Sequence, residues 1–180
     1  MNSMGVKAAG PVFWITGLSG SGKSTIANKV CARLRSQNHA SILIDGDEVR
    51  DVLNSHLGHG LEDRKKNAQQ ISKLCKWLSG QGVPVVCATM SLFQEIHEWN
   101  RKNISNYYEV YLDTPMSVLE MRDTKKLYSG VKSGAMKDVI GVDLPFDAPK
   151  TPDLVLDTSQ APNSFEEIVD RIIRLAPDFR

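Results

Sequence analysis

The sequence predicts an α/β fold, with a five-stranded parallel sheet, helices on both faces and a lid segment. Short apolar runs alternate with longer stretches of helical periodicity along the chain. The short runs are almost continuously apolar, as expected for parallel strands that are covered on both faces. One long segment, residues 123–152, is rich in Gly, Pro, Lys and Asp. A loop of this length inside a compact domain is usually a functional lid or is disordered.

Five apolar runs are predicted to be the strands. They cover residues 12–15, 41–44, 83–89, 107–112 and 154–156. The first run ends at Gly17 and the second at Asp45, and both residue types favour a change of direction. Because helices lie between the runs, each pair of strands is expected to be parallel.

Six stretches between and after these runs are predicted to be helices. They cover residues 23–35, 48–53, 62–78, 93–104, 116–122 and 164–175. In the first stretch Ile26, Val30 and Leu34 recur at helical spacing and form one apolar face. The last stretch begins with Ser164, followed three residues later by Glu167, which is the pattern of a capping box.

Length and composition limit the function classes. With 180 residues the chain is expected to form one domain, residues 1–180, with the lid inside it. The 22 basic and 21 acidic side chains give a net charge of +1, which argues against binding nucleic acid by bulk electrostatics. The apolar runs are too short for a membrane span. Cys31, Cys75 and Cys87 form no C-x-x-C pair, so we expect reduced core cysteines in a cytoplasmic protein.

The most specific local motif follows the first predicted strand. Residues 17–24 read G-L-S-G-S-G-K-S and match G-x-x-x-x-G-K-[ST] between a strand and a helix. The glycines let successive backbone N–H groups point at phosphate oxygens, and the helix N-terminus favours the anion. Lys23 can reach the β- and γ-phosphates and the Ser24 hydroxyl can bind Mg²⁺. The expected nucleoside triphosphate site comprises Gly17, Ser19, Gly20, Ser21, Gly22, Lys23, Ser24 and Thr25.

The second predicted strand ends in two carboxylates separated by a glycine, Asp45 and Asp47. Ligands of open α/β sheets bind at the carboxyl ends of the strands, so this pair is expected beside the phosphate loop. An acceptor hydroxyl needs a carboxylate to orient it, and Mg²⁺ needs oxygen ligands. We expect Asp47 to hold the acceptor hydroxyl and Asp45 the metal or its waters, although the two roles can be exchanged. Asp47 as a simple helix cap is the structural alternative.

The sequence has no N-K-x-D string of the kind with which GTPases recognise their base. A small single-domain chain with these features is therefore predicted to be a kinase of a small molecule or nucleotide. A sugar or nucleoside kinase, and a nucleotide-binding module without catalysis, remain alternatives.

The whole pattern resembles the adenylyl-sulfate kinase family. The matching stretches keep their order over nearly the whole chain: G-L-S-G-S-G-K-S-T at 17–25, D-G-D-E-V-R at 45–50, L-G at 57–58, E-D-R-K-K-N at 62–67, R-D at 122–123, L-Y at 127–128, A-P at 148–149 and D-L-V-L-D-T at 153–158. The resemblance implies a P-loop kinase fold, ATP and Mg²⁺ as cofactors, and transfer of the γ-phosphoryl group to the ribose 3′-hydroxyl of a small nucleotide. It also implies a possible homodimer.

The resemblance assigns roles to further residues. Asp45 and Asp47 match the family's acidic pair, and Lys23 its phosphate-loop lysine. The residues that match those holding the acceptor's anionic group are Arg50, Arg64 and Asn67. Ser91 matches the serine after the third strand, and residues 123–152, with Lys137, match the lid and its substrate-contacting segment. A doubly charged acceptor suits arginines, which bind anions in bidentate fashion. Solvated surface charge is the alternative for Arg64 and for the lid lysines.

Two departures from the family pattern concern the acceptor's base. The family sandwiches an adenine between two phenylalanines, and His59 and Val139 stand at those positions here. Base stacking contributes about 1–3 kcal/mol per base, so the loss of two aromatic faces matters. A related family phosphorylates cytidine diphosphoramidate in capsule synthesis, and a smaller pyrimidine would suit His59 and Val139. The sequence leaves adenylyl sulfate and cytidine diphosphoramidate open as acceptors.

Overall fold

The computed structural model describes residues 8–53, 56–123, 125–160 and 164–179. Its centre is a five-stranded sheet in the order β2-β3-β1-β4-β5, and every neighbouring pair of strands is parallel. The strands are β1 (Val12–Thr16), β2 (Ile42–Asp45), β3 (Val85–Ala88), β4 (Tyr107–Asp113) and β5 (Leu154–Asp157). The predicted fold class is confirmed, and the five predicted strands differ from the observed ones only at their ends.

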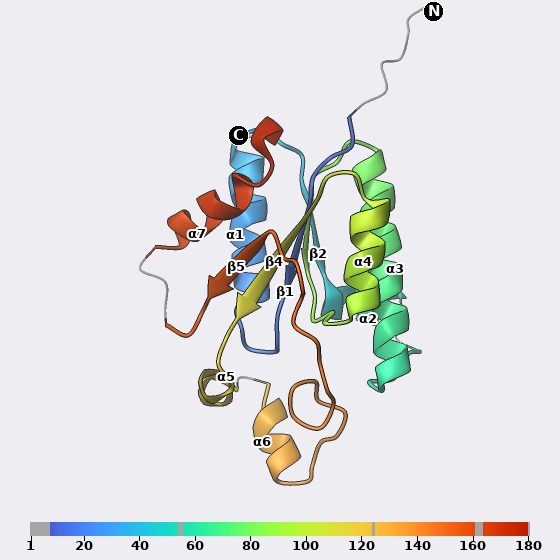
Figure 1. Cartoon of the computed structure of the whole chain (residues 1–180), viewed down its shortest axis with the longest axis vertical. Helices are drawn as coiled ribbons and strands as arrows, with labels where there is room; N and C mark the ends of the chain where they lie inside the picture. Colours follow the sequence, from blue (N-terminus) through green and yellow to red (C-terminus); the bar gives the residue numbers. More distant parts are fainter. Residues whose placement is uncertain (1–7, 54–55, 124, 161–163, 180) are drawn as a thin grey trace, which may run out of the picture.

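Helices cover both faces of this sheet (Figure 1). One face carries α1 (Lys23–Ser36) and α7 (Phe165–Ile173), and the other carries α3 (Leu61–Gly80) and α4 (Gln94–Asn103). Three shorter helices lie toward the carboxyl ends of the strands: α2 (Gly46–Leu53), α5 (Met116–Arg122) and α6 (Leu127–Lys132). A short 3-10 turn, Pro177–Phe179, ends the described chain.

Alternate residues of the central strand enter two separate cores. Val12 and Trp14 of β1 pack with Ile71 of α3, whereas Phe13 and Ile15 pack against α1 and α7. All five β1 side chains are fully buried, which explains why the sequence shows a continuous apolar run instead of an alternating one. The cysteines are free and buried in these cores, as predicted.

The serine half of the predicted capping box at the last helix is present. The Ser164 hydroxyl accepts a hydrogen bond from the backbone N–H of Glu167, and α7 begins at the next residue, Phe165. A side chain that satisfies one of the free N–H groups of the first turn fixes the start of a helix.

The segment 123–152 is not a continuous loop. It contains the helix α6 and an isolated β-bridge between Ile140 and Leu144. Sequence periodicity did not indicate α6, since the helix has six residues with Gly130 among them. A residue before the helix stabilises its first turn: the Asp123 carboxylate accepts hydrogen bonds from the backbone N–H groups of Tyr128 and Ser129. Thr124 lies outside the described residues.

Candidate active site

The phosphate loop links β1 to α1 with a backbone that only glycine adopts easily. Gly20 and Gly22 have φ values of 80° and 95°, in the left-handed region, and Gly22 is the residue at which α1 begins to turn. The Lys23 ammonium group donates to the Leu18 carbonyl oxygen at 2.7 Å, so it lies over the loop. The loop therefore presents a helix N-terminus and a cation to the same space.

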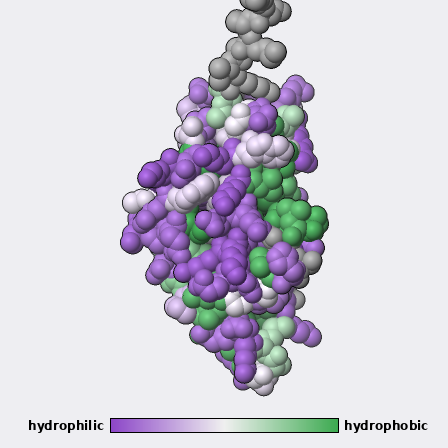
Figure 2. Space-filling view, turned by 90° about the vertical axis from the view of Figure 1, so that its right-hand side faces the viewer, coloured by the Kyte–Doolittle hydropathy of each residue, from purple (hydrophilic) through white to green (hydrophobic). Residues whose placement is uncertain are grey.

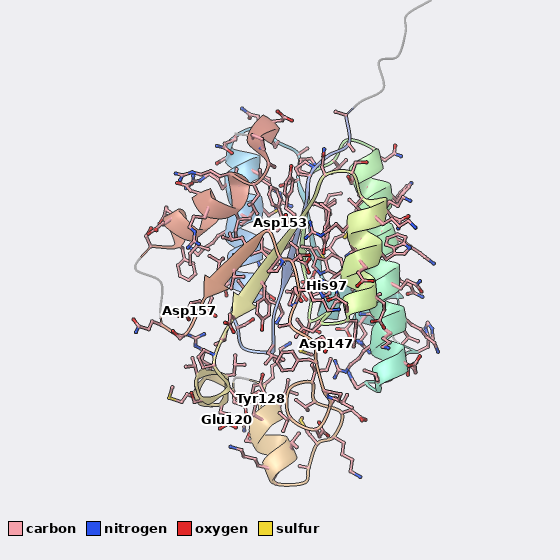
Figure 3. All side chains as sticks on the ribbon, in the orientation of Figure 1. His97, Glu120, Tyr128, Asp147, Asp153 and Asp157 are labelled. Carbon is pink, nitrogen blue, oxygen red and sulfur yellow. The ribbon has the colours of Figure 1, made fainter. Side chains whose placement is uncertain are left out.

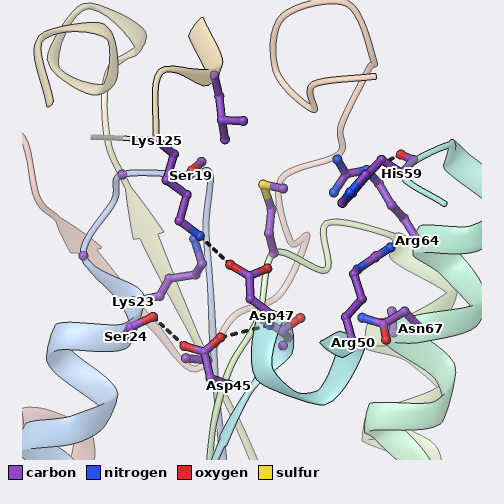
Figure 4. A pocket seen from close by; sticks show the side chains of 18 of the residues that line it. Ser19, Lys23, Ser24, Asp45, Asp47, Arg50, His59, Arg64, Asn67 and Lys125 are labelled. Carbon is purple, nitrogen blue, oxygen red and sulfur yellow. Dashed lines mark hydrogen bonds and ion pairs between the residues drawn. The ribbon is translucent and has the colours of Figure 1, made fainter. Parts of the chain in front are cut away.

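The acidic pair, Asp45 and Asp47, lies beside this loop at the carboxyl ends of the strands. Parallel strands end at one rim, and β2 brings Asp45 to the loop, where its Oδ2 accepts a hydrogen bond from Ser24 Oγ at 2.6 Å. The other oxygen, Oδ1, accepts from the backbone N–H of Asp47 at 2.9 Å. Figure 4 shows both contacts side by side at the floor of the site.

Gly46 separates the two carboxylates because nothing larger fits there. A Cβ at this position would lie 2.7 Å from Thr89 Oγ1, at the end of the neighbouring strand β3. The small residue lets α2 start directly after β2, so that Asp47 stands in the first turn of that helix. The Asp-Gly-Asp string thus sets the positions of Asp45 and Asp47 relative to the phosphate loop.

Asp47 is held by a residue of the segment 123–152. Lys125 Nζ forms an ion pair with Asp47 Oδ2 (Figure 4). Desolvation favours the neutral acid, but the hydrogen bond and charge of Lys125, helped by Lys23 and Arg50, outweigh it and lower the pKa of Asp47. The carboxylate is therefore ionised at neutral pH.

The surroundings of Lys23 favour its neutral form, whereas those of Asp47 favour its charged form. Desolvation in the loop is the largest effect and, with repulsion from Lys125, it outweighs the attraction of Asp47 and Asp45. The pKa of Lys23 is lowered to about 8. A phosphate group that arrives beside Lys23 supplies the missing countercharge.

Two arginines lie on the far side of Asp47 from the phosphate loop (Figure 4). Arg50 Nη1 donates to the Gly58 carbonyl oxygen. Arg64 donates from Nε to the His59 carbonyl oxygen at 2.6 Å and from Nη2 to the Asp138 carbonyl oxygen at 3.0 Å. Desolvation and the charge of Arg50 lower the pKa of Arg64, but the guanidinium remains a cation.

These groups surround one cavity of about 700 Å³. Its lining comprises Ser19, Gly20, Gly22, Lys23, Ser24, Thr25, Asp45, Gly46, Asp47, Arg50, Asp51, His59, Arg64, Asn67, Ala68, Ala88, Thr89, Met90, Arg122, Lys125 and Leu127. Twelve residues of this lining were predicted from sequence as site residues: Ser19, Gly20, Gly22, Lys23, Ser24, Thr25, Asp45, Asp47, Arg50, His59, Arg64 and Asn67.

Five predicted site residues do not line this cavity: Gly17, Ser21, Ser91, Lys137 and Val139. Gly17 and Ser21 shape the loop from behind, since a Cβ on Gly17 would lie 2.9 Å from Ser21 Oγ. Ser91 is buried, and its carbonyl oxygen accepts from Thr16 Oγ1 at 3.2 Å. Val139 is buried in the core on the α3 side of the sheet, and Lys137 is exposed.

Sequence reasoning missed several residues of the lining, above all Lys125, Leu127 and Arg122. Lys125 and Leu127 belong to the segment 123–152, which was expected to contact the substrate, with solvated charge as the alternative for its lysines. Thr89 and Met90 directly follow β3, so the rule that ligands bind at strand ends was the available signal for them.

Ser24 and Asp45 fit a magnesium ion. Their oxygens are the hard ligands that Mg²⁺ prefers, and they already lie 2.6 Å apart beside the loop. No group of three or more His, Cys, Asp or Glu residues suited to a metal exists within the described ranges. A magnesium ion that is bound together with nucleotide phosphates needs only one or two protein ligands.

The described helices include none that is both long and apolar enough to cross a membrane.

Comparisons with known proteins agree with this geometry. The adenylylsulphate kinase family matches residues 9–157. The cytidine diphosphoramidate kinase of Campylobacter jejuni is 39% identical over 163 residues, which cover 91% of this chain and 94% of that protein. The adenylyl-sulfate kinase of Lactiplantibacillus plantarum is 40% identical over 153 residues, covering 84% and 74% of the two chains. The Mycobacterium tuberculosis APS kinase in complex with AMPPNP and APS superposes with a TM-score of 0.86 at 34% identity, covering 94% and 98%.

Proposed function

The chain belongs to the adenylylsulphate kinase family and is an ATP-dependent kinase, and we propose that it phosphorylates the ribose 3′-hydroxyl of a nucleotide acceptor whose 5′ group is charged or of phosphoramidate type. One observation carries the proposal. Asp47 lies in a single cavity between the lysine of the phosphate loop and the arginines Arg50 and Arg64. A carboxylate between a donor site and an anion site is what an anionic acceptor with a hydroxyl group needs.

In the proposed reaction the ATP phosphates bind the loop of residues 17–25, with Lys23 beside the β- and γ-phosphates. Arg50 and Arg64 hold the acceptor's 5′ group, and Asn67 lies next to them on α3. Asp47 orients the 3′-hydroxyl and accepts its proton as the oxygen attacks the γ-phosphorus. The new O–P bond forms while the bond to the β–γ bridging oxygen breaks, and ADP leaves.

Magnesium is proposed as the metal of this site, with Ser24 Oγ and an Asp45 oxygen as its protein contacts. When bound, such an ion neutralises charge on the β- and γ-phosphates. In the present structure Asp45 also holds the backbone N–H of Asp47, so this carboxylate links the metal position to the residue that faces the acceptor.

The lining of the cavity favours cytidine diphosphoramidate as the acceptor. Among the described residues that form it, the imidazole of His59 is the one aromatic ring, and Val139 is buried elsewhere. An adenine would lack the pair of rings that would stack on both of its faces. Adenylyl sulfate is the second candidate, because the relatives that are named as adenylyl-sulfate kinases match this chain to the same degree.

A substrate panel tests the proposal. Cytidine diphosphoramidate, adenylyl sulfate, CDP, free nucleosides and simple sugars are each incubated with ATP and Mg²⁺, and ADP release is followed together with phosphorus NMR of the products. A 3′-phosphorylated nucleotide is the expected product. Turnover of sugars or free nucleosides alone would identify a different kinase, and no turnover with any acceptor would favour a nucleotide-binding module.

A homodimer and a cytoplasmic location complete the proposal. Apolar side chains are exposed on β2 and α2, where Ile42, Val52 and Leu53 are 37%, 79% and 59% accessible. Figure 2 shows green, hydrophobic side chains gathered toward one edge of the face that it presents. Light scattering of the wild type and of Leu53→Lys tests the dimer, which the charge should dissociate. Cell fractionation tests the cytoplasmic location, for which the three free cysteines are the support.

A further inference from the structure

A turn at residues 138–144 lies between the two halves of the site. Gly141 stands against the phosphate loop, because a Cβ on it would lie 3.0 Å from Leu18 Cδ2 and 3.2 Å from Leu18 Cδ1. At its other end, the Asp138 carbonyl oxygen accepts the hydrogen bond from Arg64 of α3. The turn therefore touches the loop proposed to hold ATP and an arginine proposed to hold the acceptor.

Asp143 builds this turn. Its Oδ2 accepts from the backbone N–H of Asp138 at 2.8 Å, and its Oδ1 accepts from the backbone N–H of Val139 at 2.6 Å. Asp138 has a φ of 62°, in the left-handed region, which is uncommon for a non-glycine residue. The backbone N–H groups of Gly141 and Leu144 close the turn by donating to the carbonyl oxygens of Leu144 and Val139.

The turn is anchored in the core as well as in the site. Val139 and Ile140 are 5% and 1% exposed and pack in the same apolar cluster as Leu18. Asp143 itself is exposed, and so is Asp138. Desolvation raises the pKa of Asp143, but the backbone N–H groups and the charge of Arg64 outweigh it and hold the pKa below its usual value.

Arg64 keeps donors for a ligand while it holds the turn. A guanidinium has five N–H groups, and the carbonyl oxygens of His59 and Asp138 take one from Nε and one from Nη2. These two contacts hold the guanidinium in place, and Arg64 still lines the cavity. Three N–H groups remain, which is more than a bidentate contact with an anionic oxygen pair requires.

We propose that Asp143 is a positioning residue for the acceptor site: it holds the turn at 138–144 in the shape that orients Arg64 toward the acceptor's anionic group. The inference rests on the proposed function, because it concerns how that function's anion site is held. Asp143 acts through the Asp138 carbonyl group and does not line the cavity itself.

The experiment compares Asp143→Asn, Asp143→Ala and, as a matched control, Asp147→Ala. Asp147 is an exposed carboxylate of the same segment, with no hydrogen bond or ion pair among the described residues, and Figure 3 shows where it lies. Steady-state kinetics with the acceptor that the wild type turns over give KM and kcat, and amide hydrogen exchange of the ligand-free protein reports on Asp138 and Val139.

We expect Asp143→Ala to raise the acceptor KM by about tenfold to a hundredfold, since a misplaced binding group costs about this much. The KM for ATP should stay within about twofold, and exchange should rise at Asp138 and Val139 while α3 and the strands keep their protection. Asp143→Asn keeps one of the two acceptor oxygens and should give an intermediate KM. Asp147→Ala should resemble the wild type.

A double variant separates positioning from general damage. With Arg64→Ala already in place, Asp143→Ala should add less than about twofold to the acceptor KM, because the residue through which it acts is gone. An unchanged acceptor KM in Asp143→Ala, or full additivity in the double variant, overturns the inference while the proposed function stands. A wild type that turns over no acceptor refutes the proposed function first and this inference with it.

Discussion

Replacing Asp47 by asparagine tests the centre of the proposed mechanism. The amide keeps the size of the side chain but can neither accept the proton of the acceptor hydroxyl nor form an ion pair with Lys125. Positioned acid–base groups contribute about 10²–10⁴-fold to a rate. We therefore expect kcat to fall by about this factor, which corresponds to roughly 3–5 kcal/mol in the activation barrier.

ATP binding should survive the same change. The Asp47 side chain contacts Lys125 and not the phosphate loop, and the loss of one negative charge leaves Lys23 and Lys125 in the cavity. The ATP dissociation constant should consequently stay within about threefold, because the carboxylate's effect on Lys23 is partly screened. Fluorescence titration with an ATP analogue measures binding, and coupled ADP release measures kcat.

The control is Glu48→Gln, which removes a carboxylate from the next, exposed position of α2 outside the cavity lining. It should leave both constants unchanged. The reasoning is refuted when Asp47→Asn keeps kcat within about tenfold of the wild type, below the range for a group that takes part in proton transfer. A larger loss in Asp45→Asn than in Asp47→Asn, with ATP binding retained, would exchange the roles of the two carboxylates.

Three further predictions concern charge, packing and capping. Because the pKa of Lys23 is lowered to about 8, ATP affinity should be constant below pH 8 and fall above it, as the ammonium loses its proton; a flat affinity across this range would contradict the assignment. Gly46→Ala places a Cβ 2.7 Å from Thr89 Oγ1 and should lower the free energy of unfolding by about 1–3 kcal/mol and also reduce kcat. Urea denaturation measures the first effect and steady-state kinetics the second. Ser164→Ala removes the cap of α7 and should cost about 0.5–2 kcal/mol without a change in kcat, whereas equal stability would show that the Glu167 N–H finds water instead.

Local sequence signals were enough to predict the phosphate loop and the acidic pair beside it. The phosphate loop is continuous in sequence, and its glycines dictate its backbone. Asp45 and Asp47 could be placed beside it because parallel strands end at one rim, a rule that needs no knowledge of side-chain packing. Among the helices of the described residues, α6 was not predicted, because it has six residues and its start depends on the Asp123 carboxylate.

Contacts made over long sequence separations could not be predicted in this way. Lys125 and Asp47 are 78 positions apart, and nothing in the composition of the segment 123–152 distinguishes Lys125 from Lys126 or Lys132. Val139 was expected at the acceptor's base, but it is buried in the core. A lone valine in a polar segment signals burial as readily as ligand contact, and only the path of the chain decides between the two.

The ligand-free site holds three of its cations on oxygens that a substrate can replace. Lys23 donates to the Leu18 carbonyl group, Arg50 to that of Gly58, and Lys125 pairs with Asp47. The ion pair of Lys125 with Asp47 is exposed, and such pairs contribute about 0–1 kcal/mol, so a phosphate oxygen can displace it at little cost. The cations are nevertheless already oriented, and most of the entropy of ordering them is lost on folding and not on binding. This arrangement explains how a chain with a net charge of +1 can bind two anionic nucleotides: the positive charge is concentrated and oriented at one cavity, with Asp45 and Asp47 in its midst.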